Sequence, residues 1–428
     1  MKQELILLLK QRSILLLLLL NLLLTGFSLF NGWQNISHIQ AQIGHAKQEE
    51  TLRKQDYLSQ HSQQATLDVG EVGYYVFHNV YHTPDEWSFI ALGNRLVTPY
   101  VQRIRLLGLQ GQLYDGESHH PEYVMLGGFD YAFWLVFFAP LLCIALLHDL
   151  KASEHQAQRL LFLQSLTASP GRFWWQRVLS RWLLIALTFS LPVLTFSVMH
   201  GLSSGPLLQV LLITLLYTLL WTALCAAFSL RARALNANLN ALALTSLWLV
   251  SCIVLPNLGQ LWLHQHYPVQ DGSQIALQHR QAVHSAWDLP KSATLTPFYA
   301  LYPQWQDSAP VVDRFHWKWY YAFQHMADVK LAPQVRAREQ ALLQRDHATS
   351  LLGYVLPAVW VQRSLEGIAH SNVADLLAHR QRITALHTQL RHAAYPYLFE
   401  EKPFTAEAFA RLPAFETVPE QLKNADAN

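Results

Sequence analysis

The sequence predicts a mainly α-helical, polytopic membrane protein with about five transmembrane helices and two large, largely helical segments outside the membrane. Of its 428 residues, 51% are hydrophobic and only 14% are charged, whereas a soluble domain carries about 25% charged residues. Five apolar runs approach the roughly 20 residues that a helix needs to cross a bilayer. The remaining segments are polar enough to lie in water.

The five runs are separated by polar segments and lie at Ile14–Phe30, Tyr131–Leu147, Trp182–Val198, Leu207–Leu230 and Leu239–Leu263. Pro140, Pro192 and Pro256 lie within or near them. Proline kinks a helix and frees a carbonyl, which neighbouring helices must satisfy. A kink at a gate is one interpretation, and irregular packing is the preferred one. Charged residues lie outside the run centres, so we expect any transport to be driven from elsewhere.

The first run has a basic start and an apolar centre, as a signal peptide does. Bulky residues follow it, at Phe27, Leu29, Phe30 and Trp33, where a signal peptide has small residues at its cleavage site. We therefore prefer an uncleaved anchor over a signal peptide. In both cases the following segment is exported.

Basic side chains flank alternate ends of the runs and predict the orientation, because basic loops stay in the cytoplasm. They lie before the first run, after the second and after the fourth, at Lys2, Lys10, Arg12, Lys151, Arg159, Arg172, Arg177, Arg181, Arg231 and Arg233. The link Gly201–Pro206 after the third run is uncharged. We expect a multi-pass protein with a cytoplasmic amino terminus and an external carboxyl terminus.

This orientation predicts four parts. They are a cytoplasmic amphipathic segment with the first span (1–31), a first external domain (32–127), a bundle of the second to fifth spans with a cytoplasmic coupling segment at 149–176 (128–263), and a second external domain (264–428).

Within the external parts, helical spacing of Ile36, Ile39 and Ile43 predicts that residues 34–66 continue the first span as a helix, before a turn at Asp68–Gly70. The aromatic, charge-interleaved stretch 313–343 predicts a helix in a water-soluble core, in preference to an interfacial belt. Residues 365–394 predict another amphipathic helix. Leu351–Val361 is apolar but short, so we expect a buried or membrane-skimming segment there, with a sixth span as the alternative.

Metal and nucleotide chemistry have little support. The chain has 21 His, and the pairs His78 with His82 and His264 with His266 are conceivable ligands, but no compact set of Cys or carboxylates accompanies them. We therefore expect no metal site and no cofactor, and we ascribe the histidines to biased surface composition. No nucleotide-binding loop and no hydrolase motif occur, so we expect no catalytic residues. The net charge of +2 gives no support for a nucleic-acid partner.

The stretch 125–190 carries the most informative pattern. A span ends at Asp149, a charged segment with clustered leucines follows, and a turn at 169–171 leads into the aromatic and basic run Phe173–Arg177. Such a segment predicts a helix lying along the cytoplasmic membrane face, anchored by leucines and arginines, which another protein can hold.

This stretch resembles the permease subunits of ABC transporters of the ABC-2 type. That family has an Asp-Phe opening, a proline in the second span and then E-x-E-x-G-T-L-x-x-L-L-S-x-P. Phe129–Asp130 matches the opening and Pro140 the proline, and the later matches are Asp149, Glu154, Leu160, Leu163, Ser165 and, displaced, Pro170. Gln156 replaces the second Glu, and Gln158–Arg159 replaces the Gly-Thr pair.

The resemblance implies a permease subunit in the bacterial inner membrane. A cytoplasmic ABC ATPase would carry the ATP and bind segment 149–176 and the amino-terminal helix, with the matched residues as ATPase-coupling contacts. A second permease copy or a paralogous permease would complete the pathway, with membrane lipid around it. The resemblance also implies a sixth span. The alternatives are a membrane-anchored assembly or sensing protein whose external domains bind a periplasmic partner, and a metal-handling membrane protein.

Overall fold

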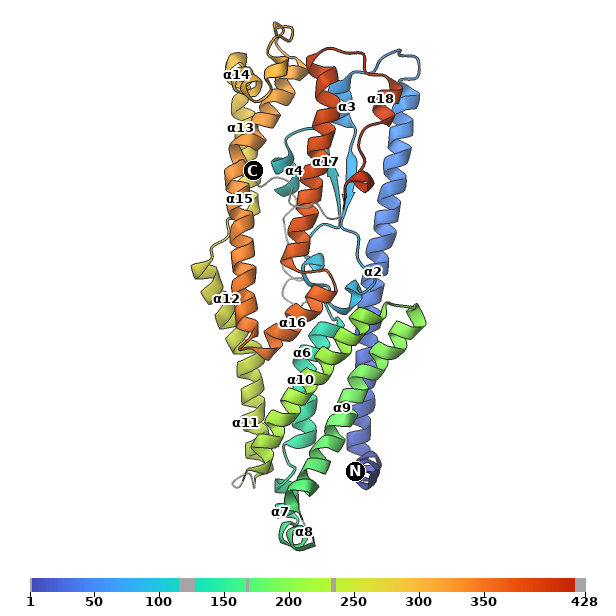
Figure 1. Cartoon of the computed structure of the whole chain (residues 1–428), viewed down its shortest axis with the longest axis vertical. Helices are drawn as coiled ribbons and strands as arrows, with labels where there is room; N and C mark the ends of the chain where they lie inside the picture. The colour runs from blue at the N-terminus through green and yellow to red at the C-terminus, as the bar shows by residue number, and fades with distance from the viewer. Residues whose placement is uncertain (1, 115–127, 167–168, 232–235, 420–428) are drawn as a thin grey trace.

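The computed structural model describes residues 2–114, 128–166, 169–231 and 236–419, which form an elongated and mostly helical molecule (Figure 1). Apolar helices form one end, the membrane bundle (residues 12–33, 131–147, 170–230 and 237–266). Shorter helices and one small sheet form the other end, the distal domain (residues 34–114 and 267–419). Among the described residues, five helices are long and apolar enough to cross a membrane, so the chain is a helical membrane protein, as the sequence predicts.

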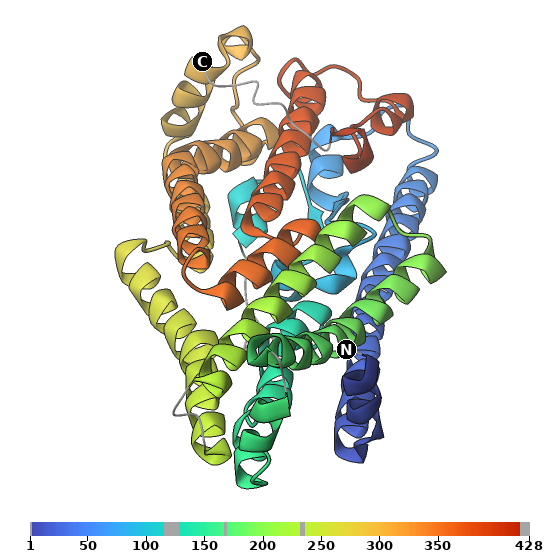
Figure 2. The same cartoon turned by 60° about the horizontal axis from the view of Figure 1, so that its bottom comes forward.

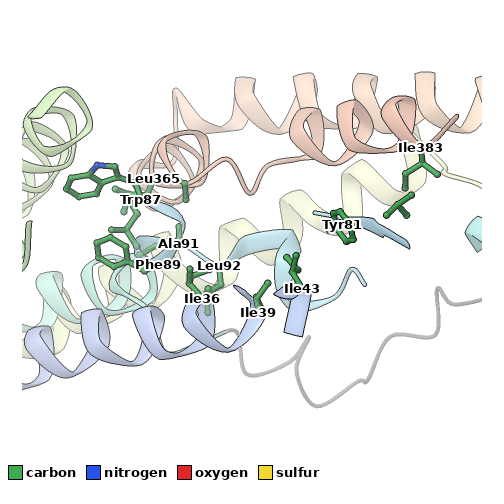
Figure 3. Packing of buried hydrophobic residues seen from close by; sticks show 14 of the residues in the cluster. Ile36, Ile39, Ile43, Tyr81, Trp87, Phe89, Ala91, Leu92, Leu365 and Ile383 are labelled. Atoms are coloured by element: carbon green, nitrogen blue, oxygen red, sulfur yellow. The ribbon is translucent and has the colours of Figure 1, made fainter. Parts of the chain in front are cut away.

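A short helix, α1 (Lys2–Lys10), opens the chain, and after a break at Gln11 the helix α2 (Arg12–Gln60) runs unbroken for 49 residues. At 1.5 Å per residue, α2 is about 74 Å long, more than twice the roughly 30 Å of a bilayer core. The helix therefore leaves the membrane bundle and continues along the distal domain, as predicted. Ile36, Ile39 and Ile43 are buried along its inner side (Figure 3).

The rest of the membrane bundle consists of α6 (Tyr131–Leu147), α9 (Pro170–His200), α10 (Ser204–Leu230) and α11 (Ala237–Leu249), which continues through the π-helical turn η3 (Val250–Val254) into α12 (Leu255–His266). Helix α6 is central, because 67% of its most apolar stretch is buried, against 17% for the α11–α12 span. Polar side chains bind across the helices: the Asn21 amide donates to the Thr188 hydroxyl at 2.9 Å, and the Trp134 indole donates to the Thr25 hydroxyl at 3.1 Å.

The first half of the distal domain contains α3 (Val69–Tyr75), α4 (Leu109–Tyr114), the 3-10 turns η1 (Ser88–Ile90) and η2 (Gly93–Leu96), and the antiparallel strands β1 (His78–Tyr81) and β2 (Val101–Ile104). His78 pairs with Ile104 and Tyr81 with Val101. The predicted turn at Asp68–Gly70 is instead the start of α3, because the Asp68 carboxylate accepts the amides of Gly70 and Glu71.

The second half of the distal domain is helical, with α13 (Gly272–Ala286), α14 (Lys291–Leu301), η4 (Pro303–Trp305), α15 (Trp317–Gly353), α16 (Pro357–Ile368), α17 (Val373–Phe399), α18 (Ala406–Ala410) and η5 (Phe415–Thr417). Trp319, Tyr321 and Phe323 on α15 are buried, which confirms the prediction of a helical core for the aromatic stretch.

The two segments of the distal domain pack into one unit. The Asp328 carboxylate on α15 accepts the backbone amides of Leu109 and Gln110 at 2.8 and 3.0 Å, and the Arg391 guanidinium on α17 donates to it at 2.6 Å. A buried carboxylate requires such partners. Figure 3 shows side chains of α2, of the segment around η1 and of α16 gathered in the same core.

The structure divides two predicted segments of the second half. Residues 365–394 are not one helix, because the chain breaks at His370, whose φ is 49°, and Asn372 caps a new helix, α17. Leu351–Val361 is the junction of α15 and α16, and Pro357 opens α16. Within the described residues, no sixth helix is long and apolar enough to cross a membrane.

Candidate functional site

The segment 149–176 lies at the end of the membrane bundle that faces away from the distal domain (Figure 1), and Figure 2 turns this end toward the viewer. It forms two short helices, α7 (Ala152–Gln156) and α8 (Leu160–Leu166), and the first turns of α9. The predicted single helix along the membrane is therefore wrong. Gln158, whose φ is 58°, takes the left-handed conformation that ends α7.

Glu154 on α7 is the centre of a set of ion pairs. Its carboxylate is only 9% exposed and accepts hydrogen bonds from Arg177 on α9 at 2.9 Å and from Arg159 at 3.0 Å. Charge-assisted hydrogen bonds of this kind are among the stronger polar contacts in proteins. Glu154 thus joins α7 to α9 through a buried ion pair, and it is not a solvated charge at the start of a helix.

The amino-terminal helix joins the same set. Glu4 on α1 accepts a hydrogen bond from Arg177 at 2.8 Å and lies 3.5 Å from the Arg181 guanidinium. Arg181 also donates to the Leu146 carbonyl at the end of α6, at 3.0 Å. We call Glu4, Glu154, Arg159, Arg177 and Arg181 the coupling network. It connects α1, α6, α7 and α9 at one end of the bundle.

Large apolar side chains are exposed on α8 and on the first turns of α9. Leu161 and Phe162 on α8 are 79% and 63% exposed, and Trp175 on the first turns of α9 is 73% exposed. We call these three residues the apolar tip. Leu160, at the start of α8, is buried. Helix α8 therefore packs on the protein through Leu160, while Leu161 and Phe162 remain exposed. Exposed apolar side chains of this kind mark surfaces that bind another protein or a membrane.

The other residues predicted from the resemblance lie around this tip. Leu163 and Asp149 are half-buried, and Ser165 is exposed, with its hydroxyl donating to the Phe162 carbonyl at 2.8 Å. Pro170 occupies the first turn of α9. The sequence reasoning missed Glu4. A signal for it existed, because Glu4 is the only acidic residue before Glu49.

The ends of the bundle differ in charge and in contacts. The basic segments at residues 2–12, 149–181 and 231 all lie at the end that carries the coupling network, where the Lys151 ammonium donates to the Arg231 carbonyl at 3.2 Å. The uncharged link between α9 and α10 lies at the other end, since the Trp87 indole in the distal domain donates to the Ser203 hydroxyl at 3.1 Å.

The two histidine pairs that the sequence offered as metal ligands do not form a metal site. His78 is buried on β1, His82 stacks on His379 with ring centroids 4.6 Å apart, and His264 and His266 are exposed on α12. In the part of the chain that the structure describes, no group of three or more His, Cys, Asp or Glu could hold a metal ion.

Comparison with known proteins gives one match. The family described as Domain of unknown function (DUF3526) matches residues 273–417, which extend from α13 to η5. No curated protein and no solved structure matches the chain. The similarity thus concerns the distal domain, and the coupling network and the apolar tip are interpreted from their own residues.

Proposed function

We propose that this chain is the membrane-spanning permease subunit of an ABC-2-type ABC transporter in a bacterial inner membrane. It would move substrate or transmit force with ATP that a separate cytoplasmic ATPase subunit hydrolyses. The amino terminus and the coupling network would face the cytoplasm, and the distal domain would lie outside. A second copy of the chain or a paralogous permease would complete the assembly.

One observation carries this proposal: the segment that presents the apolar tip is connected to the transmembrane helices by ion pairs. Leu161, Phe162 and Trp175 are exposed, while the Glu154 carboxylate on the neighbouring helix α7 is bound to Arg177 on α9. A partner that bound the apolar tip and moved would displace α7 and α8 together with α9, because the Glu154–Arg177 ion pair joins α7 to α9. Through Glu4, the same displacement would reach α1. A cytoplasmic motor needs such a connection in order to act on a membrane bundle.

The distribution of charge supports the same orientation. Basic residues concentrate at the end with the apolar tip, and short basic loops stay in the cytoplasm. The opposite end carries the distal domain and the uncharged link at 201–203. An ATPase in the cytoplasm would therefore meet the tip and not the distal domain.

Photo-crosslinking from the tip tests the proposal. A benzoylphenylalanine residue at position 162, in the full chain and in native membranes, is expected to crosslink to a protein that mass spectrometry identifies as an ATPase with a nucleotide-binding loop. The matched control places the same residue at position 199, because Met199 is 81% exposed at the opposite end of α9. That position is expected to give no ATPase adduct.

Activity provides the second measurement. In the purified complex of the chain with that ATPase, Phe162→Ser together with Leu161→Ser is expected to lower ATP hydrolysis, whereas Met199→Ser leaves it unchanged. Crosslinks at position 162 only to non-ATPase proteins would overturn the proposal. They would favour an assembly or sensing protein instead.

A further inference from the structure

A cavity of about 560 Å³ lies where the membrane bundle meets the distal domain. Helices α6 and α12 and the turn η3 line it from the bundle, and η2, α15 and α16 line it from the distal domain. Its volume falls in the range of about 300–1,000 Å³ that is typical of small-molecule sites. The coupling network lies at the other end of α6, so this cavity is a separate feature.

Most of the cavity wall is apolar. The apolar residues come from both parts of the molecule: Phe133, Val136, Phe137, Leu263, Leu352 and Val359. The rings of Phe133 and Phe137 have centroids 5.1 Å apart and are tilted by 49°, and aromatic ring faces attract cations. Cys252 reaches the wall from the π-helical turn η3, a distortion that is frequent at functional sites.

Two acidic groups and one basic group lie in this wall. Asp130, Glu366 and Arg363 line the cavity. The Arg363 guanidinium is already neutralised, because it donates to both carboxylate oxygens of Asp346 at 2.8 and 2.9 Å. Asp130 is 4% exposed and accepts the amides of Leu92 and Phe133, both at 2.8 Å. Arg363 is near enough to Glu366 to attract its carboxylate, but its hydrogen bonds go to Asp346.

Glu366 projects from α16, and its carboxylate accepts the Gln362 side-chain amide at 2.8 Å. Burial raises its pKa above the ordinary value, since the ionised form loses contact with water. A cation that entered the cavity would offset this loss and stabilise the ionised carboxylate. The cavity thus combines an apolar wall with two buried carboxyl groups. Burial raises the pKa of both, that of Asp130 to about 7, so an entering cation would favour their ionised forms.

The geometry points to a binding site for an amphipathic cation, a molecule with an apolar body and one amine or guanidinium group. The apolar body would pack on Phe133 and Phe137, and the cationic group would lie at Glu366 and Asp130. Identification of this molecule as the transported substrate rests on the proposed function. Binding itself needs only this chain.

Two ions of the same shape and opposite charge test the site. Tetraphenylphosphonium and tetraphenylborate are titrated against the full chain in phosphatidylcholine nanodiscs, with empty discs subtracted. Saturable binding of the phosphonium ion alone is expected. Glu366→Gln keeps the size of the side chain and is expected to weaken that binding by about tenfold. Glu407→Gln, a charge removal on the exposed surface of α18, is the matched control and leaves affinity unchanged.

A second variant tests the cavity without changing its charge. Val359→Trp fills the space and is expected to abolish saturable phosphonium binding, while thermal unfolding shows that each variant is folded. Equal binding of the two ions, or unchanged phosphonium affinity in both variants, would overturn the proposal. Discs that contain phosphatidylethanolamine distinguish the natural source. Weaker phosphonium binding there identifies a lipid amine, and unchanged binding identifies a cation from water.

The two proposals fail separately. The nanodisc titration contains no ATPase, so a missing partner does not affect it. The crosslink from position 162 contains no phosphonium ion, so loss of cation binding leaves it unchanged.

Discussion

The Tyr217 hydroxyl on α10 donates a hydrogen bond to the Val136 carbonyl on α6 at 2.8 Å. Pro140 lies four residues after Val136 and has no N–H to bind this carbonyl. Tyr217 thus supplies from a neighbouring helix the donor that the proline removes. The Trp248 indole donates to the next carbonyl, that of Phe137, at 3.1 Å. Two other helices therefore bind backbone carbonyls of α6 just before Pro140.

Tyr217→Phe is expected to lower the free energy of unfolding by about 1–3 kcal/mol, because it leaves the buried Val136 carbonyl without a donor. In a Pro140→Ala background the backbone N–H of residue 140 takes over, so the same change is expected to cost less. Denaturation of the four proteins in detergent measures this coupling. Equal losses in both backgrounds would show that the hydroxyl does not act through the proline.

Gly32→Ala is expected to destabilise the contact between α2 and the distal domain by about 1–3 kcal/mol. A Cβ at position 32 would lie only 2.0 Å from the Phe89 carbonyl oxygen in η1, so the helix and η1 must move apart. Gly26→Ala on the same helix is the control, since a Cβ there meets nothing within 4 Å. That control is expected to be neutral or slightly stabilising in thermal unfolding. Equal melting temperatures for the two variants would contradict the close approach.

Glu154→Gln is expected to loosen the coupling network, because Arg177 and Arg159 lose a charged acceptor. We expect α7 to be destabilised locally by about 2 kcal/mol and its amides to exchange hydrogen faster. Hydrogen–deuterium exchange with mass spectrometry measures the effect on 152–156 and on α1. His155→Gln, an exposed change on the same helix, is the control and leaves exchange as in the parent. Unchanged protection in Glu154→Gln would mean that the ion pairs do not hold α7.

Stability is expected to fall in acid through the buried histidines of the distal domain. Burial, followed by nearby arginines, lowers the pKa of His325, His379 and His387 to about 3. In the unfolded chain a histidine has a pKa of about 6.5. The unfolded state therefore binds more protons below this pH, and stability that is complete above pH 6.5 declines as the pH falls toward 3.

Urea unfolding between pH 8 and pH 5 measures this slope. His387→Gln is expected to make the slope shallower by roughly one proton, or about 1.4 kcal/mol per pH unit. The exposed His266→Gln is expected to leave it unchanged. An identical slope in His387→Gln would indicate that His387 is charged in the folded protein.

Opposite ends of the molecule are expected to lie on opposite sides of the membrane. Cys143, Cys225 and Cys252 are all buried, so the parent protein provides a low background for thiol labelling. Ser59→Cys at the far end of α2 should react with a membrane-impermeant maleimide in intact cells. Ser165→Cys on α8 should react only after lysis. Labelling of both in intact cells would contradict the orientation.

The spans and the extension of α2 could be predicted because their signals are local. Apolar length gives the spans, and the spacing of Ile36, Ile39 and Ile43 gives the buried side of α2. The break between α16 and α17 also had a local signal, since Asn372 is a favourable residue to cap a helix. Helical periodicity on both sides of this residue outweighed that signal in the prediction.

The coupling network could not be predicted, because its partners are distant in sequence. Arg177 follows Glu154 by 23 residues and Glu4 by 173 residues. Pairing at these separations depends on how α1, α7 and α9 pack. The cavity is a similar case, since Asp130 and Glu366 approach each other only when the membrane bundle and the distal domain meet.

Helix α2 has a mechanical consequence. It is fixed in the bundle through Asn21 and Thr188, and at its far part the Glu50 carboxylate accepts the Asn79 amide at 3.0 Å. An unbroken rod about 74 Å long magnifies small rotations at its base. A tilt of about 5° would carry its far end through about 6 Å. A small rearrangement of the helices in the membrane bundle would thus produce a larger displacement at the far end of α2, in the distal domain.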